Sequence, residues 1–232
     1  MTYVPTLLVP GLLCSPRLYA EQVPALWRFG PVIVASHHHD DSLAASARRV
    51  LDAAPPRFAL AGLSMGGYLA FEIMRQAGQR VTRLALLNTS ARPDTAEQVQ
   101  RRRDHIAMTQ GGRFAEVVDA LHQRLVRPAW ADDSAMHQVI RQMADETGPE
   151  AFIRQQAVAM SRPDSRPGLP AISCPVLVVA GADDNITTTG HAAEIADSIP
   201  GARLTVIPDC GHLSTLEQPA AVTRALVGWL GQ

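Results

Sequence analysis

The stretch Gly62-Leu63-Ser64-Met65-Gly66-Gly67 decides the fold of this chain. It has the form G-x-S-x-G and lies between an apolar run at 58–61 and a helical pattern at 65–77. A serine between a strand and a helix must occupy a tight, strained turn, and small flanking residues let the two elements approach without Cβ clashes. Such a turn lifts the Ser64 hydroxyl above a sheet and leaves the N–H of Met65 at the positive helix N-terminus. The stretch therefore predicts a nucleophilic serine.

Outward from this turn, short apolar runs alternate with helical patterns. The runs are residues 6–9, 32–35, 58–61, 84–87, 176–180 and 204–207, and helical periodicity occupies 43–53, 65–77, 192–199 and 220–230. Apolar runs without polar alternation are typical of strands buried on both faces. Strand–helix alternation predicts an α/β fold with a mainly parallel sheet flanked by helices, whose ligands bind at the carboxyl ends of the strands.

One long segment, residues 95–170, interrupts this alternation. It carries only helical patterns, in which apolar positions recur at three- and four-residue steps: Phe114, Val117, Val118, Leu121 and Leu125. The segment is too long for a plain loop. We therefore expect a core domain whose first part is 1–93, a helical lid insertion at 94–170, and the second part of the core domain at 171–232.

A base and an acid for the serine follow two later strands. His212 comes after the run 204–207 and a short turn, which places it on a loop at a strand's carboxyl end. The imidazole needs an orienting carboxylate, and Asp183 and Asp184 follow the run 176–180. Either aspartate can instead form a polar turn or cap the next helix. The residues alone leave both open.

The chain resembles the α/β-hydrolase-fold serine hydrolases, in their esterase and enol-lactonase-like branch, over nearly its whole length. Four stretches carry the resemblance: VPGLLC at 9–14, GLSMGG at 62–67, GADDNIT at 181–187 and DCGHLSTLEQP at 209–219. The resemblance implies a catalytic triad of Ser64, Asp184 and His212, in the chain order of this family. It favours Asp184 over Asp183 because the family's acid lies three residues after a glycine.

The same resemblance implies an oxyanion hole formed by the backbone N–H groups of Leu12 and Met65. Pro10 stands where the family often has histidine, a departure that leaves the backbone donor intact. A second departure is the sequence His37-His38-His39-Asp40-Asp41-Ser42, which replaces the family's glycine-rich loop. Three consecutive histidines cannot easily converge on one ion, so we expect no metal. The serine mechanism that the resemblance implies requires no cofactor. Cys14 and Cys210 flank the proposed site but are expected to be packing residues.

Composition narrows the function classes further. The 21 basic residues are all arginine, which excludes Schiff-base, P-loop and lysine-base chemistry. A net charge of -1 argues against nucleic-acid or anionic-membrane partners, and Arg101-Arg102-Arg103 is expected to be a solvated helix face. No apolar run reaches bilayer length, and the N-terminus lacks a signal peptide's basic region. Three cysteines without CxxC spacing favour a reducing, cytoplasmic compartment.

These observations predict a carboxylesterase or lactonase that acts on a small-molecule ester with a small to medium acyl group. The apolar content of the insertion favours an uncharged acyl chain. An alternative is a C–C bond hydrolase or lyase on a carboxylate-bearing metabolite, for which Arg154 or Arg162 would have to face the pocket. A non-catalytic ligand-binding member of the fold is the third possibility. The oligomeric state is not predicted.

Overall fold

The computed structural model describes residues 3–231 and contains one parallel sheet of six strands, in the order β2-β1-β3-β4-β5-β6. The strands are β1 (Thr6–Val9), β2 (Val32–Val34), β3 (Phe58–Leu63), β4 (Val81–Leu87), β5 (Val176–Gly181) and β6 (Arg203–Ile207). The chain goes from β1 to one neighbour, β2, and then to the other neighbour, β3. The carboxyl ends of β1 and β3 therefore lie at the point where the strand order reverses, where sheets of this kind bind ligands.

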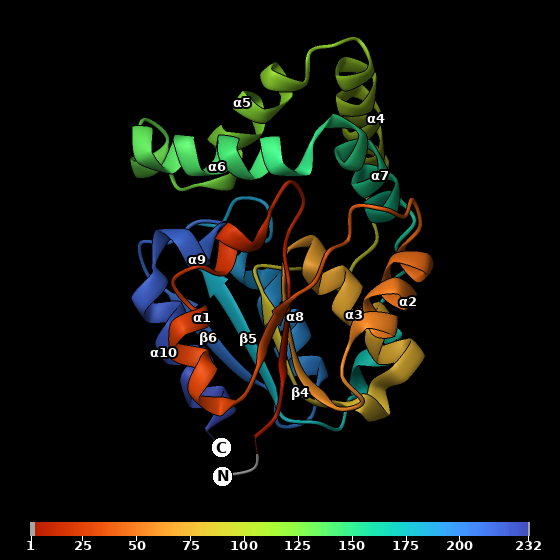
Figure 1. Cartoon of the computed structure of the whole chain (residues 1–232), viewed down its shortest axis with the longest axis vertical. Coiled ribbons are helices and arrows are strands. Elements are labelled where there is room, and N and C mark those ends of the chain that lie inside the picture. Colours follow the sequence, from red (N-terminus) through yellow and green to blue (C-terminus); the bar gives the residue numbers. More distant parts are fainter. Residues whose placement is uncertain (1–2, 232) are drawn as a thin grey trace.

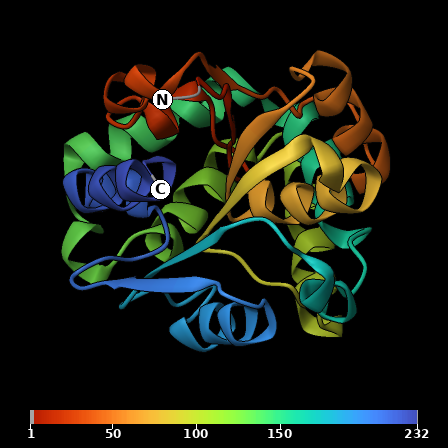
Figure 2. The same ribbon diagram turned by 90° about the horizontal axis from the view of Figure 1, so that it is seen from below.

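Helices cover both faces of the sheet (Figures 1 and 2). One face carries α2 (Leu43–Ala53), α3 (Met65–Ala77) and α8 (Thr189–Ser198), and the other carries α1 (Val23–Leu26) and α10 (Pro219–Leu230), with α9 (Ser214–Glu217) just before α10. Short 3-10 helices occupy Pro16–Tyr19, Trp27–Phe29, Gly78–Arg80, Pro128–Trp130 and Arg166–Ala171. The predicted fold class is thus confirmed: an α/β sheet that buries apolar residues on both faces.

Two helices have the bounds that the sequence predicts, because local signals set them. Helix α2 begins after Ser42, whose hydroxyl accepts a hydrogen bond from the Ala45 N–H at 3.4 Å. Such an N-cap satisfies a donor that the helix leaves unpaired. Helix α3 begins directly after Ser64, so the predicted strand–turn–helix order is also observed.

The edge strand β6 departs from the expectation of a strand buried on both faces. Leu204 and Val206 are 39% and 44% exposed, whereas every residue of β5 is buried. A strand at the sheet edge has a neighbour on one side only, so its apolar side chains receive less cover. The apolar run predicted the strand correctly but did not reveal its edge position.

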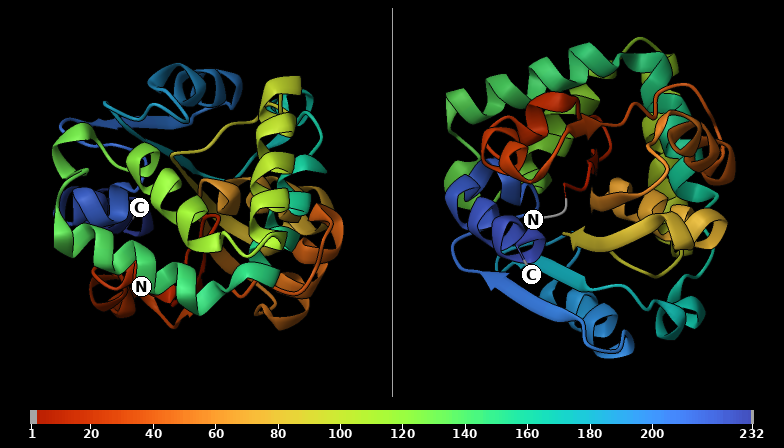
Figure 3. Two further views of the ribbon diagram at one scale, coloured as in Figure 1. Left: turned by 90° about the horizontal axis from the view of Figure 1, so that it is seen from above. Right: turned by 60° about the horizontal axis from the view of Figure 1, so that its bottom comes forward.

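The helical insertion lies over the carboxyl ends of the strands (Figure 1 and Figure 3, left). Its helices are α4 (Ala96–Gln110), α5 (Phe114–Leu125), α6 (Ser134–Thr147) and α7 (Pro149–Met160). Val117, Leu121 and Phe152 form a small apolar cluster there, which also contains Leu13 from the loop after β1. The insertion is therefore packed onto the core at that loop. Within residues 3–231, no helix combines the length and the apolarity needed to cross a membrane.

Candidate active site

Ser64 occupies a strained turn between β3 and α3, as the sequence predicts. Its backbone has φ 55° and ψ -114°, in the left-handed half of conformational space that serine rarely adopts. A Cβ on Gly62 would overlap the backbone of Gly66, and a Cβ on Gly66 would overlap the carbonyl oxygen of Val9. Both glycines are thus needed for the close approach of strand and helix. The Ser64 N–H donates to the Leu87 carbonyl at 2.9 Å, which fixes the turn to β4.

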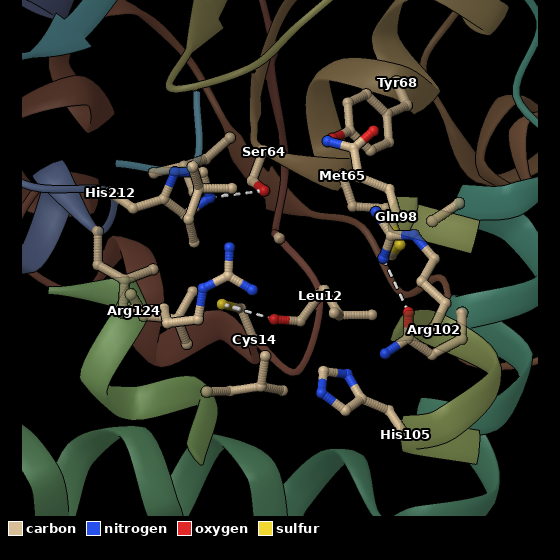
Figure 4. A pocket seen from close by; sticks show the side chains of 18 of the residues that line it. Leu12, Cys14, Ser64, Met65, Tyr68, Gln98, Arg102, His105, Arg124 and His212 are labelled. Carbon is tan, nitrogen blue, oxygen red and sulfur yellow. Dashed lines mark hydrogen bonds between the residues drawn. The ribbon is translucent and has the colours of Figure 1, made fainter. Parts of the chain in front are cut away.

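Three side chains from separate loops meet at this turn. His212 Nε2 lies 2.8 Å from Ser64 Oγ (Figure 4), and His212 Nδ1 lies 2.8 Å from Asp184 Oδ2. The side chains of His212 and Asp184 are 2% and 0% exposed. Because an ionised carboxylate only accepts hydrogen bonds, Nδ1 carries the proton and Nε2 is free to accept the hydroxyl proton of Ser64. The arrangement can therefore abstract a proton from the serine.

The carboxylate of Asp184 is held by hydrogen-bond donors on both oxygens. Oδ1 accepts from the N–H groups of Ile186 at 2.8 Å and Thr187 at 2.9 Å, and Oδ2 accepts from the Thr187 hydroxyl at 2.7 Å and from Asn88 Nδ2 at 2.9 Å. Burial raises the pKa of Asp184, but the interaction with His212 and these donors outweigh burial and hold the pKa well below its ordinary value. The acid therefore stays ionised beside the imidazole.

The neighbouring aspartate lies away from this cluster. The side chain of Asp183 is 43% exposed, and its carboxylate lies 3.4 Å from Arg127 Nε. Asn88 and Thr187, in contrast, contact Asp184 and were not singled out from the sequence. A signal for Asn88 existed, since it is a polar residue at the carboxyl end of β4, the edge where ligands and catalytic groups gather.

The loop that carries His212 is fixed by a buried glutamate, which was also missed. Glu217 Oε2 accepts from the N–H of Gly211 at 2.9 Å and of Arg127 at 3.1 Å, and Oε1 accepts from the N–H of Leu213 at 3.1 Å. Burial raises the pKa of Glu217, although these donors lower it. Glu217 thus binds the residues on both sides of His212 and connects them to the insertion at Arg127.

The predicted oxyanion donors lie on two segments that border the pocket: Met65 directly follows Ser64, and Leu12 lies in the loop after β1. Leu12 and Met65 both line the pocket with Ser64, and no hydrogen bond to a residue in the described part of the chain occupies the N–H of either. The loop after β1 turns sharply at Leu13, which has φ 60° and donates its N–H to Gln155 Oε1 at 3.0 Å. A glutamine from α7 thus fixes the loop that presents the Leu12 N–H.

One residue of the histidine run, His37, contacts the glutamine that holds this loop. His37 is buried, and its Nδ1 lies 3.2 Å from Gln155 Nε2, the residue that holds the loop after β1. Burial lowers the pKa of His37 to about 4, so the ring is neutral at pH 7. Over residues 3–231, no three histidine, cysteine or acidic side chains gather closely enough to hold a metal ion.

The two cysteines near the site are free thiols. Cys14 and Cys210 are both buried. Burial raises the pKa of each thiol to about 12, which keeps both protonated at neutral pH. Cys14 also lines the pocket, where its Sγ donates to the Leu12 carbonyl at 3.4 Å. A protonated thiol is a poor nucleophile, in agreement with the packing role expected from the sequence.

A pocket opens above Ser64 between the core and the insertion (Figure 4). Helix α4 contributes Gln98, Arg101, Arg102 and His105 to its wall, and α5 contributes Leu121, Arg124 and Leu125. The expectation that residues 101–103 form a solvated face is therefore wrong for two of the three arginines. Positions i, i+3, i+4 and i+7 share one face of a helix, and in α4 that face is polar and turned inward. The apolar content of the insertion favoured an uncharged acyl chain, and three arginines in the pocket wall, Arg101, Arg102 and Arg124, do not fit that expectation.

The two arginines singled out from the sequence lie elsewhere. Arg154 donates to the His38 carbonyl at 2.8 Å, and Arg162 forms an ion pair with Asp94 at 2.7 Å. Arg162 is 7% exposed, and its guanidinium packs over the Tyr68 ring, 4.1 Å from the ring centroid. Neither arginine is part of the pocket wall, so the condition set for the carboxylate-binding alternative is not met by these two residues.

The fold and this cluster define a class of proteins. The chain belongs to the alpha/beta hydrolase family, whose model matches residues 6–225. It is 32% identical over 181 residues to BpoC of Mycobacterium tuberculosis, which carries the name non-heme bromoperoxidase; the match covers 76% of this chain and 68% of BpoC. It is 27% identical to 3-oxoadipate enol-lactonase 2 of Acinetobacter baylyi, over 74% of this chain and 62% of that protein.

A solved structure gives a fuller match. The thermophilic esterase of Thermogutta terrifontis superposes with a TM-score of 0.88 at 31% identity, and the match covers 99% of this chain and 90% of the esterase. The enol-lactonase of Burkholderia xenovorans LB400 has a TM-score of 0.87 at 24% identity, over 100% of this chain and 93% of that one, and at that identity it shows the shared fold alone. The relatives thus include esterases and enol-lactonases.

Proposed function

We propose that this protein hydrolyses carboxylic esters or lactones with Ser64 as nucleophile, His212 as base and Asp184 as the orienting acid. The observation that carries the proposal is the pair of 2.8 Å contacts linking the three side chains at a strained turn. The alternative of a non-catalytic binding protein would not require this strain, which costs roughly 1–3 kcal/mol.

The mechanism follows from the positions of the donors and acceptors. Ser64 Oγ attacks the ester carbonyl while His212 Nε2 takes its proton, and Asp184 stabilises the imidazolium that forms. The N–H groups of Leu12 and Met65 receive the developing oxyanion, and each such donor contributes about 3 kcal/mol in related sites. His212 then donates its proton to the leaving oxygen, and water hydrolyses the acyl-enzyme by the reverse route. No step requires a cofactor.

The relatives support this reaction class. Proteins named esterase and enol-lactonase are among those most similar to this chain, and both names describe hydrolysis of a carboxylic ester bond. The insertion at 94–170 acts in this proposal as a lid that closes the pocket between the two parts of the core, 1–93 and 171–232. Its helices supply the wall opposite Ser64, which supports that role.

Hydrolysis of p-nitrophenyl esters, from acetate to octanoate, tests the proposal. We expect turnover by the wild type and a fall in kcat of at least about 10³ in Ser64→Ala. Ser173→Ala is the matched control, because Ser173 is an exposed serine away from the pocket, and it should keep wild-type activity. Absence of wild-type turnover at every chain length, or equal losses in both variants, would overturn the proposal in favour of C–C cleavage or ligand binding.

A further inference from the structure

The pocket above Ser64 has an unbalanced charge. Its wall contains Arg101, Arg102 and Arg124 but no aspartate or glutamate. This is unexpected in a chain whose formal net charge is -1. The positive charge is thus concentrated where a substrate would lie, in a site with apolar walls that strengthen its field.

One of these arginines is already paired. Arg102 binds Asp94 through Nε at 2.7 Å and Gln156 through Nη1 at 2.8 Å. Among residues 3–231, in contrast, neither Arg101 nor Arg124 has a carboxylate partner or a side-chain hydrogen bond. Two guanidinium groups, one from α4 and one from α5, are therefore left without a counter-ion in the same pocket.

The charges of Arg101 and Arg124 lie close enough to affect each other and the nearby His105. Partial burial and the charge of Arg101 lower the pKa of Arg124. Burial, followed by Arg102, Arg124 and Arg101, lowers the pKa of His105. Figure 4 shows the guanidinium of Arg124 pointing into the pocket, toward the side where Ser64 and His212 lie. Like charges held together in this way are destabilising until an anion binds between them.

We propose that the substrate carries an anionic group, a carboxylate or a phosphate, which Arg101 and Arg124 bind while the scissile ester lies at Ser64. This inference rests on the proposed hydrolase function and specifies its substrate class. Leu12, Leu121 and Leu125 form apolar wall in the same pocket, so the group between the anion and the ester is a short hydrocarbon. Guanidinium groups suit either anion because their planar N–H pairs match its oxygens.

A pair of substrates that differ only in charge tests the inference. Mono-p-nitrophenyl glutarate carries a carboxylate, and its methyl ester is the neutral counterpart with the same scissile bond. We expect the wild type to prefer the charged substrate in kcat/KM. In Arg101→Gln and in Arg124→Gln, the ratio of kcat/KM for the charged over the neutral substrate should fall about 10–100-fold, mainly through KM.

Two further variants separate charge recognition from structural damage. Arg103→Gln is the matched control, since Arg103 is an exposed neighbour on α4 outside the pocket wall, and it should leave the ratio unchanged. Arg124→Lys keeps the charge and should restore part of the preference. Equal losses on both substrates, or a wild type that prefers the neutral ester, would overturn the inference.

Binding to an inactive protein distinguishes failure of this inference from failure of the proposed function. Ser64→Ala should bind glutarate in calorimetry, and the triple variant that also carries Arg101→Gln and Arg124→Gln should not. Butyl phosphate as the competing ligand shows which of the two anions the site prefers. No binding of either anion would refute the anion site even if neutral esters are hydrolysed. Binding without any ester turnover would refute only the hydrolase.

Discussion

At Ser64 the backbone conformation suits the reaction proposed above. A φ of 55° is costly for serine, yet it directs the hydroxyl at His212 Nε2 and leaves the N–H of Met65 facing the same space. The strain persists because Gly62 and Gly66 allow a contact between strand and helix that no larger residue permits. The glycines that permit the turn and the serine that it presents are thus neighbours in the sequence. For this reason the motif was recognisable from the sequence alone.

The choice between the two aspartates is tested by exchanging each for asparagine. Asp184→Asn should lower kcat for a p-nitrophenyl ester by about 10⁴, because an amide at this position favours the wrong imidazole tautomer. Asp183→Asn is the matched control and should change kcat little, since that side chain is 43% exposed and faces Arg127. Larger loss in the control would transfer the acid role to Asp183.

The depressed pKa of Asp184 also predicts how stability depends on pH. Its folded pKa lies below the value of about 3.9 that it has when unfolded. The stabilisation is therefore complete above about pH 4 and is lost as the pH falls through the folded pKa. Thermal unfolding followed between pH 7 and pH 2 should show a shallower acid decline in Asp184→Asn than in the wild type. Parallel curves would contradict this.

At the scale of elements, the short helix α9 holds the loop that carries His212. Its last residue, Glu217, accepts three backbone N–H groups, two of which flank His212. A short helix thereby sets the position of a loop that has no regular structure of its own. Loops that hold catalytic groups need such support, because an unsupported loop would move away from a geometry that tolerates little displacement.

We predict that Glu217→Ala destabilises the protein and slows the reaction. The N–H groups of Gly211 and Arg127 lose their acceptor, whereas the Leu213 N–H keeps the Leu125 carbonyl. A buried N–H without an acceptor costs about 1–3 kcal/mol, and the displaced His212 should lower kcat more than it raises KM. Glu150→Ala is the control, because that side chain is 87% exposed, and it should change neither quantity. Urea denaturation and ester kinetics measure both effects. A folded Glu217→Ala variant with wild-type kcat would show that the His212 loop keeps its position without Glu217.

The bounds of an element could be predicted where nearby residues determine them. The position of an element in the fold was harder to predict, because it depends on packing against distant residues. The bounds of α2 and α3 match the sequence patterns at 43–53 and 65–77 because an N-cap serine and a glycine-flanked turn define their starts. The edge position of β6 and the inward face of α4 depend on distant partners. The sequence predicts a solvated face for Arg101 and Arg102, and only the position of α4 over the strand ends places them in the pocket wall.

At the scale of the whole molecule, a buried charge cluster attaches the insertion to the core. The Asp94 side chain is 2% exposed and binds Arg102 from α4 at 2.7 Å and Arg162, just after α7, at 2.7 Å. Arg162 in turn packs on Tyr68 of α3 at 4.1 Å. The two ends of the insertion thus meet at one carboxylate above the core helix that follows Ser64.

Removing this carboxylate should loosen the whole insertion. Asp94→Asn leaves the buried Arg162 and the partly buried Arg102 without the carboxylate they share. Removal of one partner from a buried ion pair typically costs about 3–5 kcal/mol. Glu194→Gln removes a surface partner of Arg92, whose side chain is 52% exposed, and should cost no more than about 1 kcal/mol. Urea denaturation gives the stabilities, and amide hydrogen exchange should rise in α4 and α7 of Asp94→Asn. Equal stabilities would contradict the attachment.

The parallel sheet with its flanking helices and the helical insertion were predicted from the sequence, whereas the pocket wall was not. Strand patterns and glycine-rich turns act over a few residues, so the sheet and the three site loops could be anticipated. The wall depends on how α4 and α5 are placed over the carboxyl ends of the strands, which many contacts between distant residues determine. Arg124 was therefore never singled out, although Leu121 and Leu125 on the same helix face were.

The connection between the insertion and the histidine loop has a practical consequence for redesign. The carbonyl of Leu125 accepts a hydrogen bond from the Leu213 N–H at 3.1 Å, and the Arg127 N–H binds Glu217. An engineer who replaces the whole insertion in order to change the pocket would also replace the two residues that make these bonds. A graft that retains residues 125–127 of this chain, and replaces only the helices on either side, would change the pocket while preserving the position of His212.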